Sequence, residues 1–276
     1  MFPETRAKPV EVIIRPNAAD AADLTARIIA AKMRANPRLT LGLATGRTME
    51  SVYARLAQMH HADGLDFSQC RTFNLDEYAG LPGGDPHSYR HCMNQRLFSK
   101  VNIDLRNTHL PDGAAADLEA ECENYERRIV AAGGIDLQLL GIGLAGHLGF
   151  NEPLSAFRSR TRVKALAPAT LAQNAPLFAD PEAMPRRGIT MGIGTILDCR
   201  QCLLLATGEA KAAIVAQAVE GPMTGMISAT ALQLHPRCAV VLDEAAAGEL
   251  KATDYYRWIF ENEPEWEPFR TRPPAH

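Results

Sequence analysis

A histidine and a carboxylate in a glycine-rich loop are the residues of this sequence best placed to do chemistry. His147 follows Gly146, and Glu152 comes five residues after the histidine. A glutamate can accept from one imidazole nitrogen, which fixes the tautomer and leaves the other nitrogen for a substrate. A lone histidine is more often structural, so its position matters. The loop follows the apolar segment 135–142, typical of a buried parallel strand, and open α/β sheets carry their chemistry at such strand ends.

Two adjacent carboxylates, Asp76 and Glu77, follow a strand predicted over residues 71–75. Successive side chains of an extended chain point to opposite sides, so we expect one carboxylate to face a central crevice while the other binds locally. The carboxylate in the crevice could act as a general base if it is partly desolvated. Taken alone, the pair is more typical of a helix N-cap or a surface acid.

The turn Thr45-Gly46-Arg47-Thr48 joins a strand predicted over 39–43 to a helix predicted over 49–59. Backbone N–H groups and the positive end of a helix suit a phosphate, and the Arg47 guanidinium could hold its oxygens. The turn lacks the GxGxxG and Walker patterns, so an ordinary strand-to-helix turn explains it about equally well. Lys211 follows another apolar segment and is either a further cation of this site or a solvated helix residue.

Strand and helix patterns alternate along the sequence, and these elements must position the candidate residues. Further strands or apolar segments are predicted at 10–14, 190–193, 201–205 and 239–242, and further helices at 20–35, 88–98, 115–132 and 211–219. The alternation predicts an α/β fold, a single-domain Rossmann-like parallel sheet with helices on both faces. We expect a domain over residues 1–260 and a C-terminal tail over 261–276 that packs loosely or at an interface.

Composition argues against several classes of protein. The net charge of −3 over 276 residues provides no basic surface for nucleic acid, and no apolar run of 18 residues predicts a membrane span. The first residues are charged where a signal peptide needs an apolar core, so a cytoplasmic location is expected. The six cysteines include one isolated CxxC, Cys199 and Cys202, which fits two reduced structural thiols better than a disulfide or a zinc site.

Taken together, these residues resemble the glucosamine-6-phosphate deaminase family, also called glucosamine-6-phosphate isomerases, from Leu41 to about Leu250. The resemblance is carried, in order, by LGLATGRT, FNLDEYAGLP, SYRHCMNQRLF, GIGLAGHLGFNEP, SRTRVKAL, ITMGIGTILD, TGEAKA and SATALQLHP. It implies the conversion of glucosamine 6-phosphate and water to fructose 6-phosphate and ammonia, without a metal or an organic cofactor. The same fold also hosts sugar-phosphate lactonases, but FNLDEY and GFNEP resemble the deaminase branch.

The resemblance also implies roles for individual residues. Asp76 matches the carboxylate that moves a proton from C2 to C1, His147 the histidine that assists sugar-ring opening, and Glu152 the acid that orients this histidine. The implied phosphate-binding residues are Thr45, Gly46, Arg47, Thr48 and Lys211. The implied effector-contacting residues, in bacterial hexamers that bind N-acetylglucosamine 6-phosphate, are Ser155, Arg162 and Lys164. A homo-oligomer is therefore expected, although a basic strand edge that serves only folding would explain the last three residues equally well.

Three positions depart from the family pattern. Ala145 stands where an aspartate gives the histidine a second supporting acid, and Pro176 falls near the family's phosphate-binding arginine. Arg47 stands where glycine or serine is usual, and we expect it to supply the missing charge from the opposite side of the pocket. The leading prediction is therefore an enzyme that isomerises and deaminates a hexosamine 6-phosphate, with an altered substrate preference left open. The alternatives are a catalytically impaired sugar-phosphate sensor and a lactonase.

Overall fold

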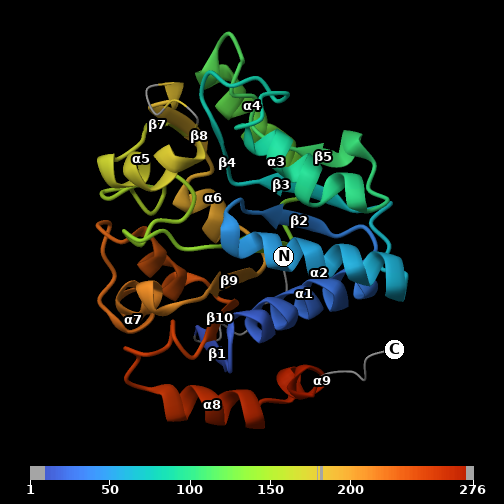
Figure 1. Ribbon diagram of the computed structural model, residues 1–276, viewed down its shortest axis with the longest axis vertical. Helices are drawn as coiled ribbons and strands as arrows, with labels where there is room; N and C mark the ends of the chain where they lie inside the picture. Colours follow the sequence, from blue (N-terminus) through green and yellow to red (C-terminus); the bar gives the residue numbers. More distant parts are fainter. Residues whose placement is uncertain (1–9, 179, 181–182, 272–276) are drawn as a thin grey trace.

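The central feature of the computed structural model, which describes residues 10–178, 180 and 183–271, is a parallel sheet. Within these residues seven parallel strands lie in the order β1-β10-β9-β6-β2-β3-β5 (Figure 1). The strands are β1 (Glu11–Arg15), β2 (Thr40–Leu43), β3 (Arg71–Asn74), β5 (Thr108–His109), β6 (Leu137–Leu140), β9 (Cys202–Ala206) and β10 (Cys238–Asp243). Where a strand or apolar segment was predicted for this sheet, the observed strand lies within a few residues of the predicted range.

Every residue of β2, β6, β9 and β10 is buried, so other parts of the chain cover both faces of this sheet. The helices are α1 (Ala18–Ala35), α2 (Arg47–Asp63), α3 (Tyr89–Arg96), α4 (Leu118–Ala131), α5 (Pro168–Asn174), α6 (Ile193–Leu197), α7 (Ala212–Glu220), α8 (Thr253–Asn262) and α9 (Glu267–Arg270). In Figure 1, α1 and α2 pack side by side in front of the sheet. The predicted α/β class with a parallel sheet is confirmed.

A second, antiparallel sheet was not predicted. It consists of β4 (Asp76–Tyr78), β8 (Arg187–Thr190) and β7 (Arg162–Ala165) in the order β4-β8-β7. The apolar segment noted over 190–193 spans the end of β8 at Thr190 and the start of α6 at Ile193. The chain turns at Gly192, where a Cβ would lie only 2.1 Å from the Ser159 carbonyl oxygen. This close backbone approach requires glycine.

The C-terminal segment packs against the body of the molecule. Trp266 is only 3% exposed, and Arg27 of α1 donates to the carbonyl oxygens of Pro268 and Thr271 at 3.0 and 2.8 Å. Figure 1 shows α8 and α9 crossing the lower side of the molecule. The expectation of loose packing is therefore wrong for residues 261–271, because the buried indole and the carbonyl contacts fix them. Residues 272–276 lie outside the described part of the chain.

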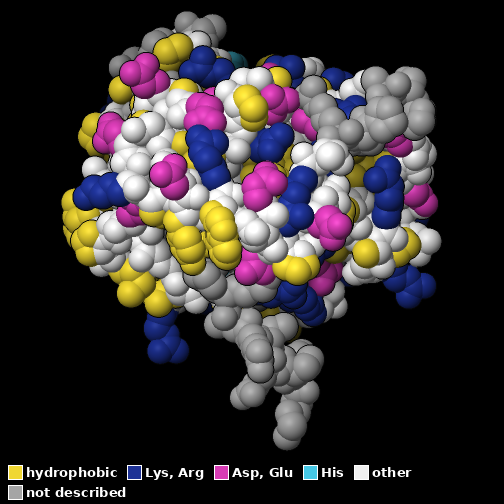
Figure 2. Space-filling model, turned by 90° about the horizontal axis from the view of Figure 1, so that it is seen from below, with side chains coloured by type: hydrophobic (Ala, Val, Ile, Leu, Met, Phe, Trp, Pro, Cys, Tyr) yellow, Lys and Arg dark blue, Asp and Glu magenta, His cyan; other side chains and the backbone are white. Residues whose placement is uncertain are grey.

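The lower face of the molecule, seen in Figure 2, has mixed charge. Basic and acidic side chains alternate across it, with a small group of hydrophobic side chains between them. On this side α8 exposes Tyr255 and Trp258, by 58% and 59%. None of the helices in the described residues is long and apolar enough to cross a membrane.

Candidate active site

A pocket of about 230 Å³ lies where the carboxyl ends of β2, β3, β6 and β9 meet. Open parallel sheets place their ligand sites at this edge. Of the predicted catalytic and phosphate-binding residues, all but Glu152 line this pocket. These lining residues are Thr45, Gly46, Arg47, Thr48, Asp76, His147 and Lys211. The fold thus brings together residues that are up to 166 positions apart, from Thr45 to Lys211.

The two adjacent carboxylates point in different directions, as predicted. Asp76 lines the pocket and is only 5% exposed. Glu77 faces away and accepts hydrogen bonds at 2.9 Å from the backbone N–H groups of Tyr78, Tyr89 and Arg90. Glu77 therefore anchors the start of α3, while Asp76 is left for the pocket.

Burial makes Asp76 a weak acid. Its desolvation, assisted by the negative charge of Glu77, raises the pKa of Asp76 from its ordinary 3.8 to about 8. The backbone of the glycine-rich loop lies close to this carboxylate. A Cβ at Gly149 would be 3.1 Å from Asp76 Oδ2 and 2.9 Å from Thr190 Oγ1. Gly149 also has a φ of +55°, so glycine is required here on both counts. A carboxyl group with a pKa near 8 can exchange a proton with substrate at neutral pH.

His147 and Glu152 form the second reactive group. His147 Nδ1 lies 3.2 Å from Glu152 Oε2, and the other carboxylate oxygen accepts from the Ala167 N–H at 3.0 Å. Burial alone would raise the pKa of Glu152, but the neighbouring His147 imidazole, together with the Ala167 N–H, outweighs it and lowers the pKa. The imidazole lies over Gly143, where a Cβ would be 1.9 Å from Nε2. Glu152 thus holds one ring nitrogen while the ring itself lines the pocket.

The phosphate-loop candidate begins a long helix. Gly46, with a φ of +123°, is the N-cap of the 17-residue α2, and Arg47 is its first residue. The free N–H groups and the helix dipole therefore direct positive potential into the pocket.

Lys211 reaches the same pocket and donates from Nζ to the Ile142 carbonyl oxygen at 2.7 Å. Burial lowers the pKa of Lys211. The loop before it is fixed by Asp243, which accepts from the Gly208 N–H at 3.0 Å.

The departures from the family pattern have visible consequences in the pocket. Ala145, two residues before His147, is half-buried and provides no second carboxylate. Pro176 is exposed and does not line the pocket, so among the described lining residues the cations are Arg47 and Lys211. The wall contributed by α5 carries only uncharged polar side chains, Thr170, Gln173 and Asn174.

The predicted effector residues are partly brought together. Arg162 donates to Ser155 Oγ at 3.0 Å and to Asn151 Oδ1 at 2.9 Å. Ser155 Oγ in turn donates to the Glu152 carbonyl oxygen at 2.7 Å, so this group contacts the backbone of the acid that holds His147. Lys164 lies two residues further along β7, on the same side of the strand as Arg162.

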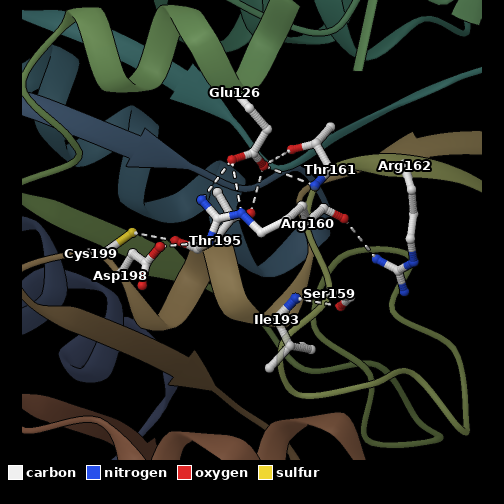
Figure 3. A network of polar contacts seen from close by, with 9 residues as sticks. All are labelled: Glu126, Ser159, Arg160, Thr161, Arg162, Ile193, Thr195, Asp198 and Cys199. Atoms are coloured by element: carbon white, nitrogen blue, oxygen red, sulfur yellow. Dashed lines mark hydrogen bonds and ion pairs between the residues drawn. The ribbon is translucent and has the colours of Figure 1, made fainter. Parts of the chain in front are cut away.

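Glu126 anchors the segment that leads into β7 (Figure 3). Its carboxylate accepts from the Thr161 N–H at 2.8 Å, from Thr195 Oγ1 at 2.6 Å and from Arg160 at 2.7 Å. These hydrogen bonds, against the opposing effect of burial, lower the pKa of Glu126. In Figure 3 the Arg162 guanidinium donates to the Arg160 carbonyl oxygen, at 3.4 Å. The network therefore fixes the backbone from which Arg162 extends.

Sequence reasoning missed several pocket residues. Tyr89, Gln173 and Asn174 line the pocket, and Asn174 Nδ2 donates to the Tyr78 hydroxyl at 3.0 Å. The position of Tyr89 twelve residues after Glu77 gave no signal by itself, because only the cap of α3 on Glu77 brings it to the pocket. Among the described residues no group of three or more His, Cys, Asp and Glu side chains could hold a metal ion.

Three comparisons with known proteins agree with this geometry. The family model of glucosamine-6-phosphate isomerases/6-phosphogluconolactonase matches residues 16–240. A glucosamine-6-phosphate deaminase of Arthrobacter sp. (strain FB24) is 47% identical over 258 residues, which cover 94% of this chain and 99% of that protein. A glucosamine-6-phosphate deaminase of Shewanella loihica is 49% identical over 250 residues, which cover 91% of this chain and 93% of that one.

Solved structures share the fold. A monomeric glucosamine-6-phosphate deaminase superimposes with a TM-score of 0.85 and 41% identity, covering 87% of this chain and all of that one. A 6-phosphogluconolactonase from Thermotoga maritima gives a TM-score of 0.68 at 22% identity, covering 85% of this chain and all of that one. At that identity the second similarity concerns the fold alone.

Proposed function

The chain belongs to the family of glucosamine-6-phosphate isomerases and 6-phosphogluconolactonases, and from this membership we propose that it is a hexosamine-6-phosphate deaminase. The reaction converts glucosamine 6-phosphate and water to fructose 6-phosphate and ammonia. The observation that carries the proposal is the buried Asp76, with a pKa of about 8, in one pocket with His147 and two cations. These are the groups that a proton transfer on a phosphorylated sugar requires.

The pocket suggests a role for each side chain. The N–H groups at 45–48, with Arg47 and Lys211, bind the phosphate and so fix the sugar. His147, oriented by Glu152, assists opening of the ring. Asp76 then takes the proton from C2 and returns it to C1, while a proton passes from the amine to O1, so that C1 becomes an alcohol and C2 an imine. Water hydrolyses this imine to the ketone and releases ammonia.

An ammonia-release assay on glucosamine 6-phosphate and galactosamine 6-phosphate tests the proposal. We expect turnover of at least one substrate by the wild type and none by Asp76→Asn. The ratio of the two rates defines the substrate preference. Tight binding of both sugar phosphates without ammonia release would instead indicate the sensor considered above. Hydrolysis of 6-phosphogluconolactone without ammonia release would indicate a lactonase.

The proposal includes an assembled, cytoplasmic enzyme. Copies of this chain associate through the surface beside Ser155, where Leu154, Met223 and Met226 are 77%, 51% and 52% exposed. The Leu154 N–H donates to the Gly225 carbonyl oxygen, so these side chains belong to adjoining loops. The free thiols of all six cysteines are consistent with a reducing compartment. Light scattering of the purified protein tests the assembly, and the mass of a single chain would contradict it.

A further inference from the structure

A second cavity, of about 180 Å³, lies under the C-terminal segment at the opposite edge of the central sheet. Gln201, which precedes β9, and Cys238, which begins β10, lie in its wall, so it is at the amino ends of these strands. The pocket described above is at their carboxyl ends. We call this second space the tail cavity, because residues 265–269 close one side of it.

Hydrogen-bond donors without partners surround the tail cavity. The side chains of Lys32, Gln201 and Arg237 line it and form no hydrogen bond or ion pair with any residue that the structure describes. The indole Nε1 of Trp266, also in its wall, is buried and has no hydrogen-bond partner either. A buried donor without a partner costs free energy, so the indole Nε1 favours an acceptor atom within the cavity.

Two acids, Glu11 and Glu265, line the tail cavity beside its two cations, and each has further interactions of its own. Burial and then the charge of Arg237 lower the pKa of Lys32, and the opposing effect of Glu265 is the smallest of the three. Lys32 and Arg237 therefore repel each other across the cavity, and an anion between them would relieve this repulsion.

The remaining wall is apolar and fixed in place. Trp266, Phe269 and Ile28 provide it, and the contacts of Arg27 with the carbonyl oxygens of 268, 269 and 271 hold the segment that carries both aromatic rings. Ligand sites typically combine such a preformed apolar wall with a few polar groups. We propose that the tail cavity binds a small organic anion, with its phosphate or carboxylate at Lys32 and Arg237 and its apolar body against Trp266 and Phe269.

Tryptophan fluorescence tests this site directly. The chain has two tryptophans, and Trp258→Phe, at an exposed position, leaves Trp266 as the only one. This variant is titrated with phenyl phosphate, benzoate, inorganic phosphate and phenol. We expect a saturable change with phenyl phosphate or benzoate, and binding at least about tenfold weaker for inorganic phosphate and for phenol, since each lacks one half of the ligand. The comparison of phenyl phosphate with benzoate identifies the preferred acid group.

Charge variants in the same background assign the contacts. Lys32→Met and Arg237→Met should each weaken binding about tenfold or more, because each removes a charged donor. Arg237 is exposed, so its variant folds even if the half-buried Lys32 does not tolerate replacement. Arg34→Met is the matched control, an exposed cation on α1 outside the cavity, and should bind like its parent.

Two outcomes would overturn the proposal: no saturable fluorescence change with any probe, or equal binding in the Lys32, Arg237 and Arg34 variants. The proposal is independent of the deaminase function. Asp76→Asn should abolish ammonia release while leaving the Trp266 response intact, so failure of one proposal is distinguishable from failure of the other.

Discussion

At the residue scale, the chemistry of this protein depends on two neighbouring carboxylates with different surroundings. Glu77 accepts three backbone N–H groups, whereas Asp76 is buried with the charge of Glu77 beside it. Burial raises the pKa of both carboxyls, but at Glu77 the three hydrogen bonds oppose this effect, whereas at Asp76 the charge of Glu77 adds to it. The same acid type therefore serves as a structural anchor at one position and as a proton carrier at the next.

The pH dependence of turnover follows from the raised pKa of Asp76. Proton abstraction needs the ionised carboxylate, so kcat/KM should rise with pH through about 8. In Glu77→Gln the neighbouring charge is gone, and the rise should move to lower pH, while the titrations of the substrate stay the same. Steady-state kinetics between pH 6 and 9.5 measure both profiles. Identical profiles in the two proteins would contradict the assignment.

Ionisation of Asp76 should also affect stability. Its folded pKa of about 8 lies above the ordinary 3.8, so the folded state holds this proton more tightly than the unfolded chain. Stability from this group is therefore complete below the ordinary pKa and is lost as pH rises to about 8. Urea denaturation should show a loss between pH 5 and 8 that is smaller in Asp76→Asn. An equal loss in both proteins would contradict the raised pKa.

Arg47 is expected to replace the missing phosphate-binding arginine. Arg47→Ala should raise KM roughly tenfold or more with a smaller effect on kcat, because a charge-assisted hydrogen bond to phosphate is lost. Arg34→Ala, an exposed arginine outside the pocket, is the control and should leave KM unchanged. Unchanged affinity for the sugar phosphate in Arg47→Ala would refute this role.

Ala145 leaves His147 with a single supporting acid. Ala145→Asp should raise kcat, by about tenfold, because an orienting carboxylate fixes the histidine tautomer and Glu152 already provides part of this effect. Ala145→Asn adds a side chain of similar size without the charge and should give much less. If both variants fold and neither exceeds the wild type, then one acid is sufficient for His147.

At the element scale, the strands of the large sheet and the helix α2 place the reactive groups, and a small sheet completes the site. Asp76 lies in β4 and not at the end of β3, and β4 pairs with β8 at Thr190. The Thr190 hydroxyl accepts from the Phe150 N–H at 3.1 Å, which connects this sheet to the loop of His147. The antiparallel sheet thus fixes Asp76 relative to the histidine loop.

Glu77 connects this sheet to α3, and its removal should weaken both. In Glu77→Gln the amide has one acceptor oxygen for three N–H groups, so at least one donor is left unsatisfied. We expect a loss of about 1–3 kcal/mol in the free energy of unfolding. Urea denaturation measures it, with the exposed Glu267→Gln as the control. An unchanged free energy of unfolding would mean that water replaces the lost acceptor for the N–H groups at the start of α3.

At the scale of the whole molecule, the C-terminal segment is part of the core. Trp266 packs with Phe260 and Phe269 and is 3% exposed. Trp266→Ala should cost about 3–5 kcal/mol of unfolding free energy, as large-to-small core substitutions do. Trp258→Ala, at an exposed position on α8, should change it by about 0.5 kcal/mol or less. Equal effects in thermal and urea unfolding would indicate that the segment does not contribute to the core.

The amino-acid sequence by itself determined the alternating strands and helices, the opposite directions of Asp76 and Glu77, and the strand ends that carry the site. These features follow from local periodicity, and parallel strands bring their carboxyl ends together. Only the tertiary structure decided the antiparallel sheet, the contact of Arg162 with Ser155 and Asn151, and the burial of Trp266. Each of these depends on contacts between segments distant in sequence or on a loop conformation, which residue spacing does not encode.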